Sequence, residues 1–370
     1  MLILLCHKLL EKTRHRSFMP SFRGLGKCVT RLMIPVLLVL LVLVVPAYLG
    51  SNQNSYYYGS SHIFGPETQL GADIEAIEAV FGKSDTYVLM VPRGNAAQEK
   101  ELSAALKELP QVSSILSYVD NEGSVIPTEY VEKDTLSKLI SAHYSRLVLS
   151  VKADLEGDTT FKLVGRVREI AQSYYPGQWL LAGEGVSTCD MKETVTADMA
   201  KVNLIAIAAV FIVLLLSFKS LSLPVILVLA IEAGIWINTA IPYFTNQSVF
   251  YISYLIITSI QLGATVDYAI LFTDRYTEFR RTLQKKEVIV QTVSSVTVSI
   301  LTSGLTLTVV GFLMGRISTH GLLSQLGFFL GRGALLSMGI VLFALPGMLC
   351  LLDGLIERTT RGASFAKKGE

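Results

Sequence analysis

Long apolar stretches alternate with polar segments along the chain, and six of them are long enough to cross a membrane. The hydrocarbon core of a bilayer is about 30 Å thick and needs roughly 20 apolar residues of helix. The predicted spans are residues 33–49, 202–218, 221–241, 251–273, 293–314 and 326–352. The last is longer than a membrane requires and contains Gly331-Arg332-Gly333. This run predicts a tilt, a break or an interfacial position for the outer end, with Arg332 near the outer interface.

The polar segment between the first two spans has the pattern of a domain that folds in water. The pattern of apolar and polar positions predicts strands at 86–91, 112–119, 146–152 and 179–182, and helices at 96–109, 128–141 and 159–174. Two strand-helix-strand units of this size predict a small α+β sandwich of the ferredoxin type. A helix at 186–201 is expected to run into the second span. The predicted divisions are 1–32, the transmembrane helix 33–50, the inserted domain 51–200, the spans 201–352 and the tail 353–370.

Lysine and arginine gather in three connections, and their placement orients the chain. They precede the first span, separate the second from the third, and follow the fourth: Lys8, Lys12, Arg14, Arg16, Arg23, Lys27, Arg31, Lys219, Arg275, Arg280, Arg281, Lys285 and Lys286. Positive connections stay on the cytoplasmic side of a membrane. We therefore expect a multi-pass protein of the cell membrane with both termini cytoplasmic and the inserted domain outside. The composition agrees, since 51% of residues are hydrophobic and only 17% are charged, with a net charge of +2.

The sequence gives no support for an enzyme, a cofactor, a metal site or a nucleic-acid partner. Four cysteines (Cys6, Cys28, Cys189 and Cys350) have no paired spacing, so we expect neither a disulfide nor a thiolate metal site. There is no phosphate-binding loop and no zinc-protease motif. His62 and His143 are isolated, which favours structural or solvated roles. The row Tyr56-Tyr57-Tyr58 is interpreted as an interfacial anchor, with contact to a lipid-like molecule as the alternative.

The fourth predicted span carries the most informative motif, Gly263-Ala264-Thr265-Val266-Asp267-Tyr268-Ala269. An aspartate in the middle of a membrane helix costs about 2.5–3.5 kcal/mol and is by default a functional candidate. Desolvation favours its protonated form until water or a cation reaches it, so Asp267 is a candidate proton carrier. Gly263 lies one turn earlier and allows close approach of another helix, while Tyr268 supplies a hydroxyl that can hydrogen-bond a carboxyl group.

The fifth predicted span has hydroxyl side chains at helical spacing on one face: Ser295, Ser299, Thr302, Ser303 and Thr306. Together they are candidates to line a proton path. The alternative is that each bonds back to a carbonyl of its own helix and helps tight packing. Glu232 and Asn238 in the third span are secondary candidates for ion handling.

The order of one helix, a ferredoxin-like outer domain and five helices, with G-x-x-x-D-Y in the fourth span, resembles one half of a resistance-nodulation-division (RND) transporter. The nearest resemblance is to the MMPL (mycobacterial membrane protein large) branch, through the segment 263–275, the trailing Asp274-Arg275-Tyr276, and Leu345-Pro346-Gly347. The resemblance implies proton-driven export of lipids or other amphiphiles. It also implies that Asp267 and Tyr268 form the proton-relay pair and that the outer domain is the porter domain, with the proton gradient as the energy source.

The chain departs from that family by carrying one half where two are usual, so a second Asp-Tyr pair is missing. Residues 9–13 (LLEKT) parallel residues 355–359 (LIERT), which suggests that the N-terminal segment is the tail of a preceding half. A chance match of two basic amphipathic segments is the alternative. A second transporter half or another copy of the chain is the expected partner, besides membrane lipids and the amphiphile cargo.

Two other functions remain as alternatives. A protein-export accessory of the SecDF type shares the half-repeat plan and uses intramembrane carboxylates, although its fourth-helix motifs differ. A non-transporting sensor or scaffold would not need Asp267, whereas a transporter would fail when this residue becomes Asn.

Overall fold

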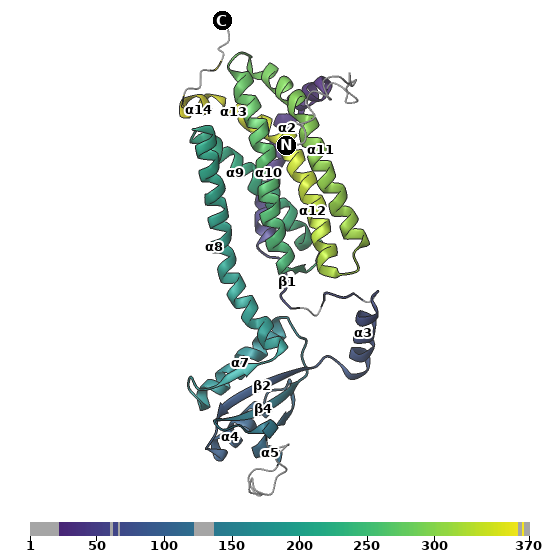
Figure 1. The fold of residues 1–370 in the computed structure, drawn as a ribbon, viewed down its shortest axis with the longest axis vertical. Coiled ribbons are helices and arrows are strands. Elements are labelled where there is room, and N and C mark those ends of the chain that lie inside the picture. Colours follow the sequence, from purple (N-terminus) through teal and green to yellow (C-terminus); the bar gives the residue numbers. More distant parts are fainter. Residues whose placement is uncertain (1–21, 60–61, 66, 122–136, 362–364, 366–370) are drawn as a thin grey trace, which may run out of the picture.

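The computed structural model describes residues 22–59, 62–65, 67–121, 137–361 and 365. Within these residues, six helical segments are long and apolar enough to span a membrane, as expected from the sequence. They are α2 (Arg23–Ser51), α8 (Glu184–Phe218), α9 (Ser222–Phe244), α10 (Tyr251–Arg280), α11 (Lys285–Ile317) and a last span built from α12 (Gly321–Gly339), a π-helical segment (Ile340–Ala344) and α13 (Leu345–Leu351). Figure 1 shows these helices running side by side, with the sheet domain at one end.

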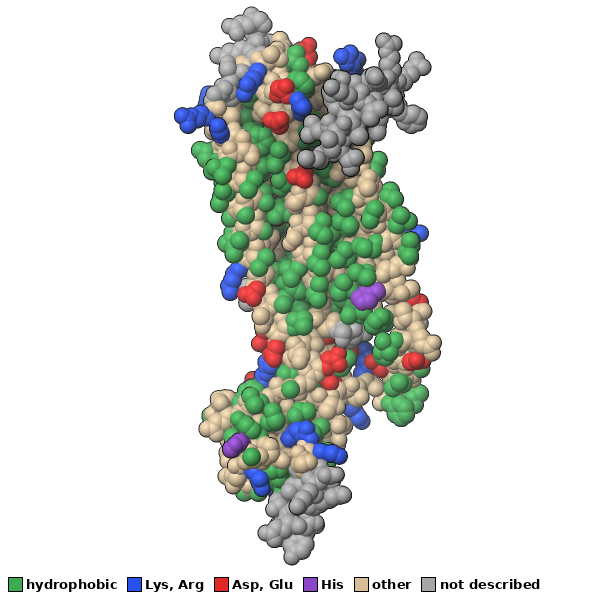
Figure 2. Space-filling model, in the orientation of Figure 1, with side chains coloured by type: hydrophobic (Ala, Val, Ile, Leu, Met, Phe, Trp, Pro, Cys, Tyr) green, Lys and Arg blue, Asp and Glu red, His purple; other side chains and the backbone are tan. Residues whose placement is uncertain are grey.

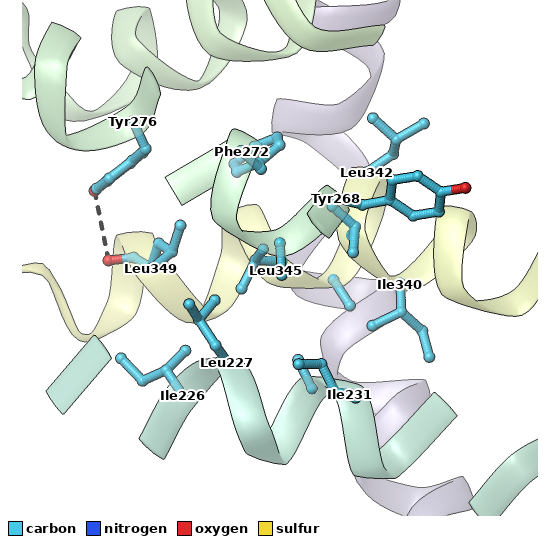
Figure 3. Packing of buried hydrophobic residues seen from close by; sticks show 14 of the residues in the cluster. Ile226, Leu227, Ile231, Tyr268, Phe272, Tyr276, Ile340, Leu342, Leu345 and Leu349 are labelled. Carbon is cyan, nitrogen blue, oxygen red and sulfur yellow. Dashed lines mark hydrogen bonds between the residues drawn. The ribbon is translucent and has the colours of Figure 1, made fainter. Parts of the chain in front are cut away.

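The last span and α9 form the centre of the bundle. Ile231 on α9, Phe272 on α10 and Leu345 on α13 are fully buried in one apolar cluster, and Figure 3 shows them converging. In Figure 1, α8 runs along one side of the bundle, and most of its span is exposed. The surface of the helices is largely hydrophobic in Figure 2, with most charged side chains towards the two ends. This distribution is typical of a membrane bundle.

Small residues let α11 and α12 approach closely. A Cβ atom added at Gly311 would lie 2.5 Å from the backbone nitrogen of Gly331, and one added at Gly315 would lie 3.0 Å from the ring of Phe328. A side chain at Gly311 would therefore clash with the backbone of α12, and one at Gly315 would require the ring of Phe328 to shift. Close packing of this kind replaces the hydrophobic drive that is absent between helices in lipid.

Of the three alternatives expected for the outer end of the last span (a tilt, a break or an interfacial position), a break at residues 331–333 is not present. The helix α12 continues through these residues, and the irregularity lies further on, at the π-helical segment Ile340–Ala344. Pro346 follows directly and has no N–H to bond the carbonyl of Leu342, which explains the local widening. Gly331 and Gly333 serve instead as close-packing positions, because a Cβ atom on Gly333 would lie 2.8 Å from the side-chain amides of Asn238 and Gln261.

The sheet domain contains β2 (Asp85–Pro92), α4 (Ala96–Lys107), β3 (Val112–Leu116), α5 (Tyr118–Asn121), β4 (Tyr144–Val151), α7 (Asp158–Tyr174) and β5 (Leu180–Ala182). The sheet they form in the described residues has the order β3-β4-β2-β5, with every neighbouring pair antiparallel. Alternate residues of β2 and β4 are buried, and α4 and α7 contribute Leu102 and Val167 to the same core. The four predicted strands and the helices predicted at 96–109 and 159–174 are thus present, with shifts at their ends.

Three features of this region differ from the expectation. The strand predicted at 112–119 ends at Leu116 and is followed by the short helix α5. The sequence reading also missed the helix α3 (Gln69–Phe81), which lies to one side in Figure 1 and leaves Ile77 and Phe81 exposed. Most of the helix predicted at 128–141 falls on residues 122–136, which lie outside the described residues.

Two connections join the sheet to the bundle. The helix α8 is continuous, so the predicted boundary between residues 200 and 201 falls inside one helix; its first turns bury Val186 in the core of the sheet, and its last turns bury Leu214 in the core of the bundle. The second connection is β1 (Tyr56–Tyr57), which pairs in parallel with β6 (Val249–Phe250). A displacement of the bundle can therefore be transmitted to the sheet through a rigid element.

The first helix α2 begins, and α14 lies, at the end of the bundle away from the sheet. A Cβ atom on Gly26 of α2 would lie 2.8 Å from the carbonyl oxygen of Val290, in the second turn of α11. Thr360, just after α14 (Asp353–Thr359), forms a bridge with Ser220 between α8 and α9. Figure 1 shows α14 at this end.

Candidate functional site

Asp267 lies on a face of α10 that the other described helices leave uncovered. Its side chain is exposed and makes no hydrogen bond or ion pair with the described residues. Gly263, one turn earlier, is exposed as well, and a Cβ atom added there would meet no atom within 4 Å. The close approach of a helix expected at Gly263 is therefore not made within this chain. The face of Asp267 and Gly263 is open.

Tyr268 points to a different side of α10. Successive residues of a helix are rotated by about 100°, and this rotation takes the Tyr268 ring into the core, beside Phe272 and Leu342 (Figure 3). Its hydroxyl lies 3.2 Å from the hydroxyl of Ser303 on α11. The acid Asp267 is thus exposed, whereas the neighbouring phenol of Tyr268 is held in place by the core.

The hydroxyl stripe of α11 lies on one exposed face, as its spacing predicts. Ser295, Ser299, Thr302, Ser303 and Thr306 are all exposed, while Val296, Ile300 and Gly304 on the opposite side are buried. Ser295, Thr302 and Thr306 donate to the carbonyls of Thr292, Val298 and Thr302 at 2.7–2.8 Å, which is the alternative interpretation given for them. Ser303 is the member of the stripe that joins α11 to Tyr268.

A buried polar cluster joins α9, α10 and α12. Asn238, a secondary candidate from the sequence, is fully buried, and its amide nitrogen donates to Oε1 of Gln261 at 2.9 Å and to the carbonyl of Phe329 at 3.1 Å. The Gln261 amide nitrogen lies 3.4 Å from the hydroxyl of Ser337, which lies 2.6 Å from that of Thr265. Sequence reasoning missed Gln261, Thr265 and Ser337. The available signal was the spacing of Gln261 and Thr265, four residues apart on one face of the fourth span.

Glu232, the other secondary candidate, is buried on α9 with only 5% of its surface exposed, and its Oε1 atom has no hydrogen-bond partner. It interacts electrostatically with Tyr254 of α10, a residue that the sequence reading did not select. The ring of Tyr254 also packs edge-on against the ring of Tyr56, with the ring centroids 5.5 Å apart. The tyrosine row after α2 therefore packs onto α10 close to a buried acid.

A buried ion pair between Arg280 and Asp353 lies at the end of the bundle away from the sheet. Nε and Nη2 of Arg280 lie 3.0 and 3.1 Å from the two carboxylate oxygens of Asp353, to which Tyr276 also donates at 2.9 Å. Lys285 adds a contact at 3.2 Å. Burial alone would raise the pKa of Asp353, but the hydrogen bonds from Arg280, Tyr276 and Lys285 outweigh it and hold the pKa below the ordinary carboxyl value.

A cavity of about 310 Å³ lies where the sheet domain meets the bundle. Its walls are largely apolar and aromatic, and they include Tyr57, Met191, Phe250 and Leu322. Glu156 holds one side by accepting hydrogen bonds from the backbone N–H groups of Tyr58 and Gly59 at 2.8 and 3.1 Å. Cavities of this size, with mostly apolar walls and a few polar groups, are typical of small-molecule sites.

The described residues offer no group of three or more His, Cys, Asp or Glu side chains that could hold a metal ion. Within the same residues Cys28, Cys189 and Cys350 are free thiols. His62 stacks on Tyr57 with ring centroids 4.1 Å apart and lies 3.9 Å from Glu156, so it supports the tyrosine row.

The geometry can be compared with known proteins. A model of the MMPL family matches residues 63–362, which covers most of the chain. No curated protein matches the chain. The matched range includes the sheet, the open face of α10, the hydroxyl stripe and the buried cluster.

Proposed function

The chain belongs to the MMPL family, whose members are transporters of the RND superfamily, and from this premise we propose that it is one half of a proton-driven exporter of lipids or other amphiphiles. In this proposal the proton gradient is the energy source and no cofactor takes part. One charge that crosses a potential of 100 mV releases about 2.3 kcal/mol, so a few protons supply enough free energy for a conformational cycle.

The observation that carries the proposal is the position of Asp267. An acid in the middle of a membrane helix is unfavourable by about 2.5–3.5 kcal/mol, and here no described side chain compensates it. Beside it lie the Tyr268–Ser303 hydroxyl pair and the exposed hydroxyl stripe of α11. These groups can accept and donate hydrogen bonds, which is what a proton relay requires.

We infer that a second transporter half, or a second copy of this chain, covers the open face. Gly263 is suited to such a contact, because it presents no side chain and has free space beside it. Contact there would place Asp267 and the α11 stripe between two halves, away from lipid. The expected polar interior would then form at the interface between halves.

We further propose that the sheet domain is a ferredoxin-like porter domain outside the cell membrane, with both termini cytoplasmic. The element order β2-α4-β3-β4-α7-β5 and the antiparallel strand order support this assignment. The cavity at its junction with the bundle would then receive an amphiphile from the outer leaflet, with its tail against Tyr57, Phe250 and Leu322.

The test is gradient-dependent efflux of a fluorescent amphiphile from vesicles that contain the full chain. Asp267→Asn should abolish the efflux, because the amide cannot carry a proton. Asp274→Asn is the matched control, since it makes the same change two turns further along α10 at an exposed position. It should keep the wild-type rate.

The assay is run on the chain alone and with a candidate partner half. Dependence on the partner would support the assignment as one half of a transporter. Equal efflux from the wild type and Asp267→Asn, with both proteins folded, would refute the proton-relay role. Absence of gradient-dependent efflux in every combination would refute export of the amphiphiles tested.

A further inference from the structure

Arg332 is a charged residue in a membrane span, and no acid among the described residues forms an ion pair with it. Arg332 lies eleven residues after Gly321, the first residue of α12. This separation corresponds to about 16 Å along the helix axis. Within the described residues no carboxylate lies within ion-pair distance of Arg332, and its buried Nε atom has no hydrogen-bond partner. Its guanidinium lies over the ring of Phe329, 4.9 Å from the ring centroid. An arginine is costly at such a position unless a partner meets it.

The side chain borders a cavity of about 410 Å³ between α9 and α12. Several polar groups of the wall are already engaged: Gln325 bonds the backbone of Ser248 and Phe250, and Ser324 donates to the carbonyl of Gly315. Gln247 and Thr319 are exposed residues of the wall, and the side-chain amide of Gln247 and the hydroxyl of Thr319 have no partner within the described residues. Both border the cavity together with Arg332.

The walls also select for an apolar group. Phe328 and Phe329 form one side of the cavity, and Pro242 of α9 contributes to another. Glu67 is the acidic member of the lining, but it is exposed and lies beyond ion-pair distance from Arg332. The cavity therefore combines a guanidinium, an amide and a hydroxyl with aromatic surface.

We propose that this cavity binds the anionic headgroup of an amphiphile, a phosphate or a carboxylate, with the headgroup on Arg332 and the start of the tail against Phe328 and Phe329. Guanidinium groups bind such anions through two parallel N–H donors, and the stack on Phe329 holds the group in place for this contact. The proposal takes amphiphile export as its premise and assigns the headgroup class of the cargo.

The test measures binding and does not depend on transport. The full chain is purified in dodecyl maltoside, and labelled dodecyl phosphate is titrated against it. Arg332→Gln should weaken binding by at least about tenfold, because it removes a charge-assisted contact. Arg332→Lys should give an intermediate affinity, since it keeps the charge but not the two-point geometry. Arg316→Gln, at an exposed position near the end of α11, is the matched control and should stay within about twofold of the wild type.

Competition separates an amphiphile from a free anion. Unlabelled dodecyl phosphate should displace the label, whereas an equal concentration of inorganic phosphate should not. Displacement by inorganic phosphate at the same concentration would replace the proposed amphiphile site with a simple anion site. Equal binding by the wild type and Arg332→Gln would overturn the assignment.

A second variant keeps the test decisive if Arg332→Gln does not fold. Gln247→Leu removes a donor from the opposite wall and leaves the arginine in place, and it should weaken binding several-fold. Unchanged binding in this variant would also count against the site. The outcome is separate from that of the transport assay, since dodecyl phosphate binding can persist when gradient-driven efflux is absent.

Discussion

The hydroxyl of Tyr268 lies 3.2 Å from the hydroxyl of Ser303 and joins α10 to α11 beside the exposed Asp267. Because both groups can donate and accept, this contact can carry a hydrogen bond in either direction. The pair therefore connects the open face of α10 with the hydroxyl stripe of α11. The two hydroxyl groups of this contact can be removed separately by substitution.

Tyr268→Phe should lower gradient-dependent efflux by at least about tenfold, because it removes the phenol next to the proton carrier. Ser303→Ala removes the same hydrogen bond from its other end and should lower the efflux less than Tyr268→Phe, because the phenol beside Asp267 remains. Each variant should lower the free energy of unfolding by only about 1 kcal/mol. Efflux and thermal unfolding are measured on the same preparations. An equal loss of efflux in both variants would assign the effect to the helix contact and not to the phenol.

The open face of α10 predicts that a bulky residue at Gly263 leaves the isolated chain stable. A Cβ atom added there meets no atom of the described residues within 4 Å, so Gly263→Leu should unfold at the wild-type temperature in detergent. Gly311→Leu should be strongly destabilising, because its Cβ atom would lie 2.5 Å from the backbone of Gly331.

The same Gly263→Leu variant should lose association with the second half, since the new side chain projects into the proposed contact. Cross-linking in membranes, followed by sizing of the product, measures the association. Association as strong as in the wild type would place the partner on another face.

The sequence predicted the positions of the membrane spans well, but it did not predict which face of each helix is covered by its neighbours. Both outcomes have physical reasons. A bilayer requires a minimum apolar length, so α9 and α10 could be read from the hydropathy of the chain alone. Which side of α10 is covered depends on its neighbours, and the exposure of Asp267 could not be derived from residues 263–269. The buried pair Thr265–Ser337 was missed for the same reason, because it joins positions 72 apart in the sequence.

Two further features depended on tertiary structure. The run Gly331-Arg332-Gly333 looked like a helix break, but α12 packs its glycines tightly against α9, α10 and α11 and stays helical. The helix α3 was missed although Leu70, Ile74, Ile77 and Phe81 recur at helical spacing; all four side chains are exposed and join no core among the described residues.

The Arg280–Asp353 ion pair predicts a pH-dependent stability. The folded pKa of Asp353 is held below its ordinary value of 3.8, so the pair contributes stability at neutral pH, where the carboxylate is ionised in both states. This contribution should fall as the pH drops through about 4 and below, where the unfolded chain takes up the proton first. Unfolding temperatures measured between pH 7 and pH 3 in detergent should show this loss.

Asp353→Asn should lower the free energy of unfolding by about 3–5 kcal/mol at neutral pH, because it removes the charge of the buried carboxyl group that pairs with the Arg280 guanidinium. Asp274→Asn, at an exposed position on α10, should change it by less than about 0.5 kcal/mol. The acid-dependent decrease in stability should also be smaller in Asp353→Asn than in the wild type. The same decrease in both would assign it to other carboxylates.

The continuity of α8 predicts that a break in this helix separates the movements of the two cores. Lys201 lies between the part of α8 that packs on the sheet and the part that packs on the bundle, and its side chain is 73% exposed. Lys201→Pro removes a backbone donor and bends the helix, at a local cost of about 3 kcal/mol, without removing a buried side chain. Both cores should keep their protection from hydrogen exchange, while gradient-dependent efflux should fall severalfold.

Lys201→Ala loses the same exposed ion pair with Asp198 and should transport normally, because such a pair contributes at most about 1 kcal/mol. Normal efflux in Lys201→Pro would mean that the bundle acts on the sheet domain through β1 and β6 and not through α8.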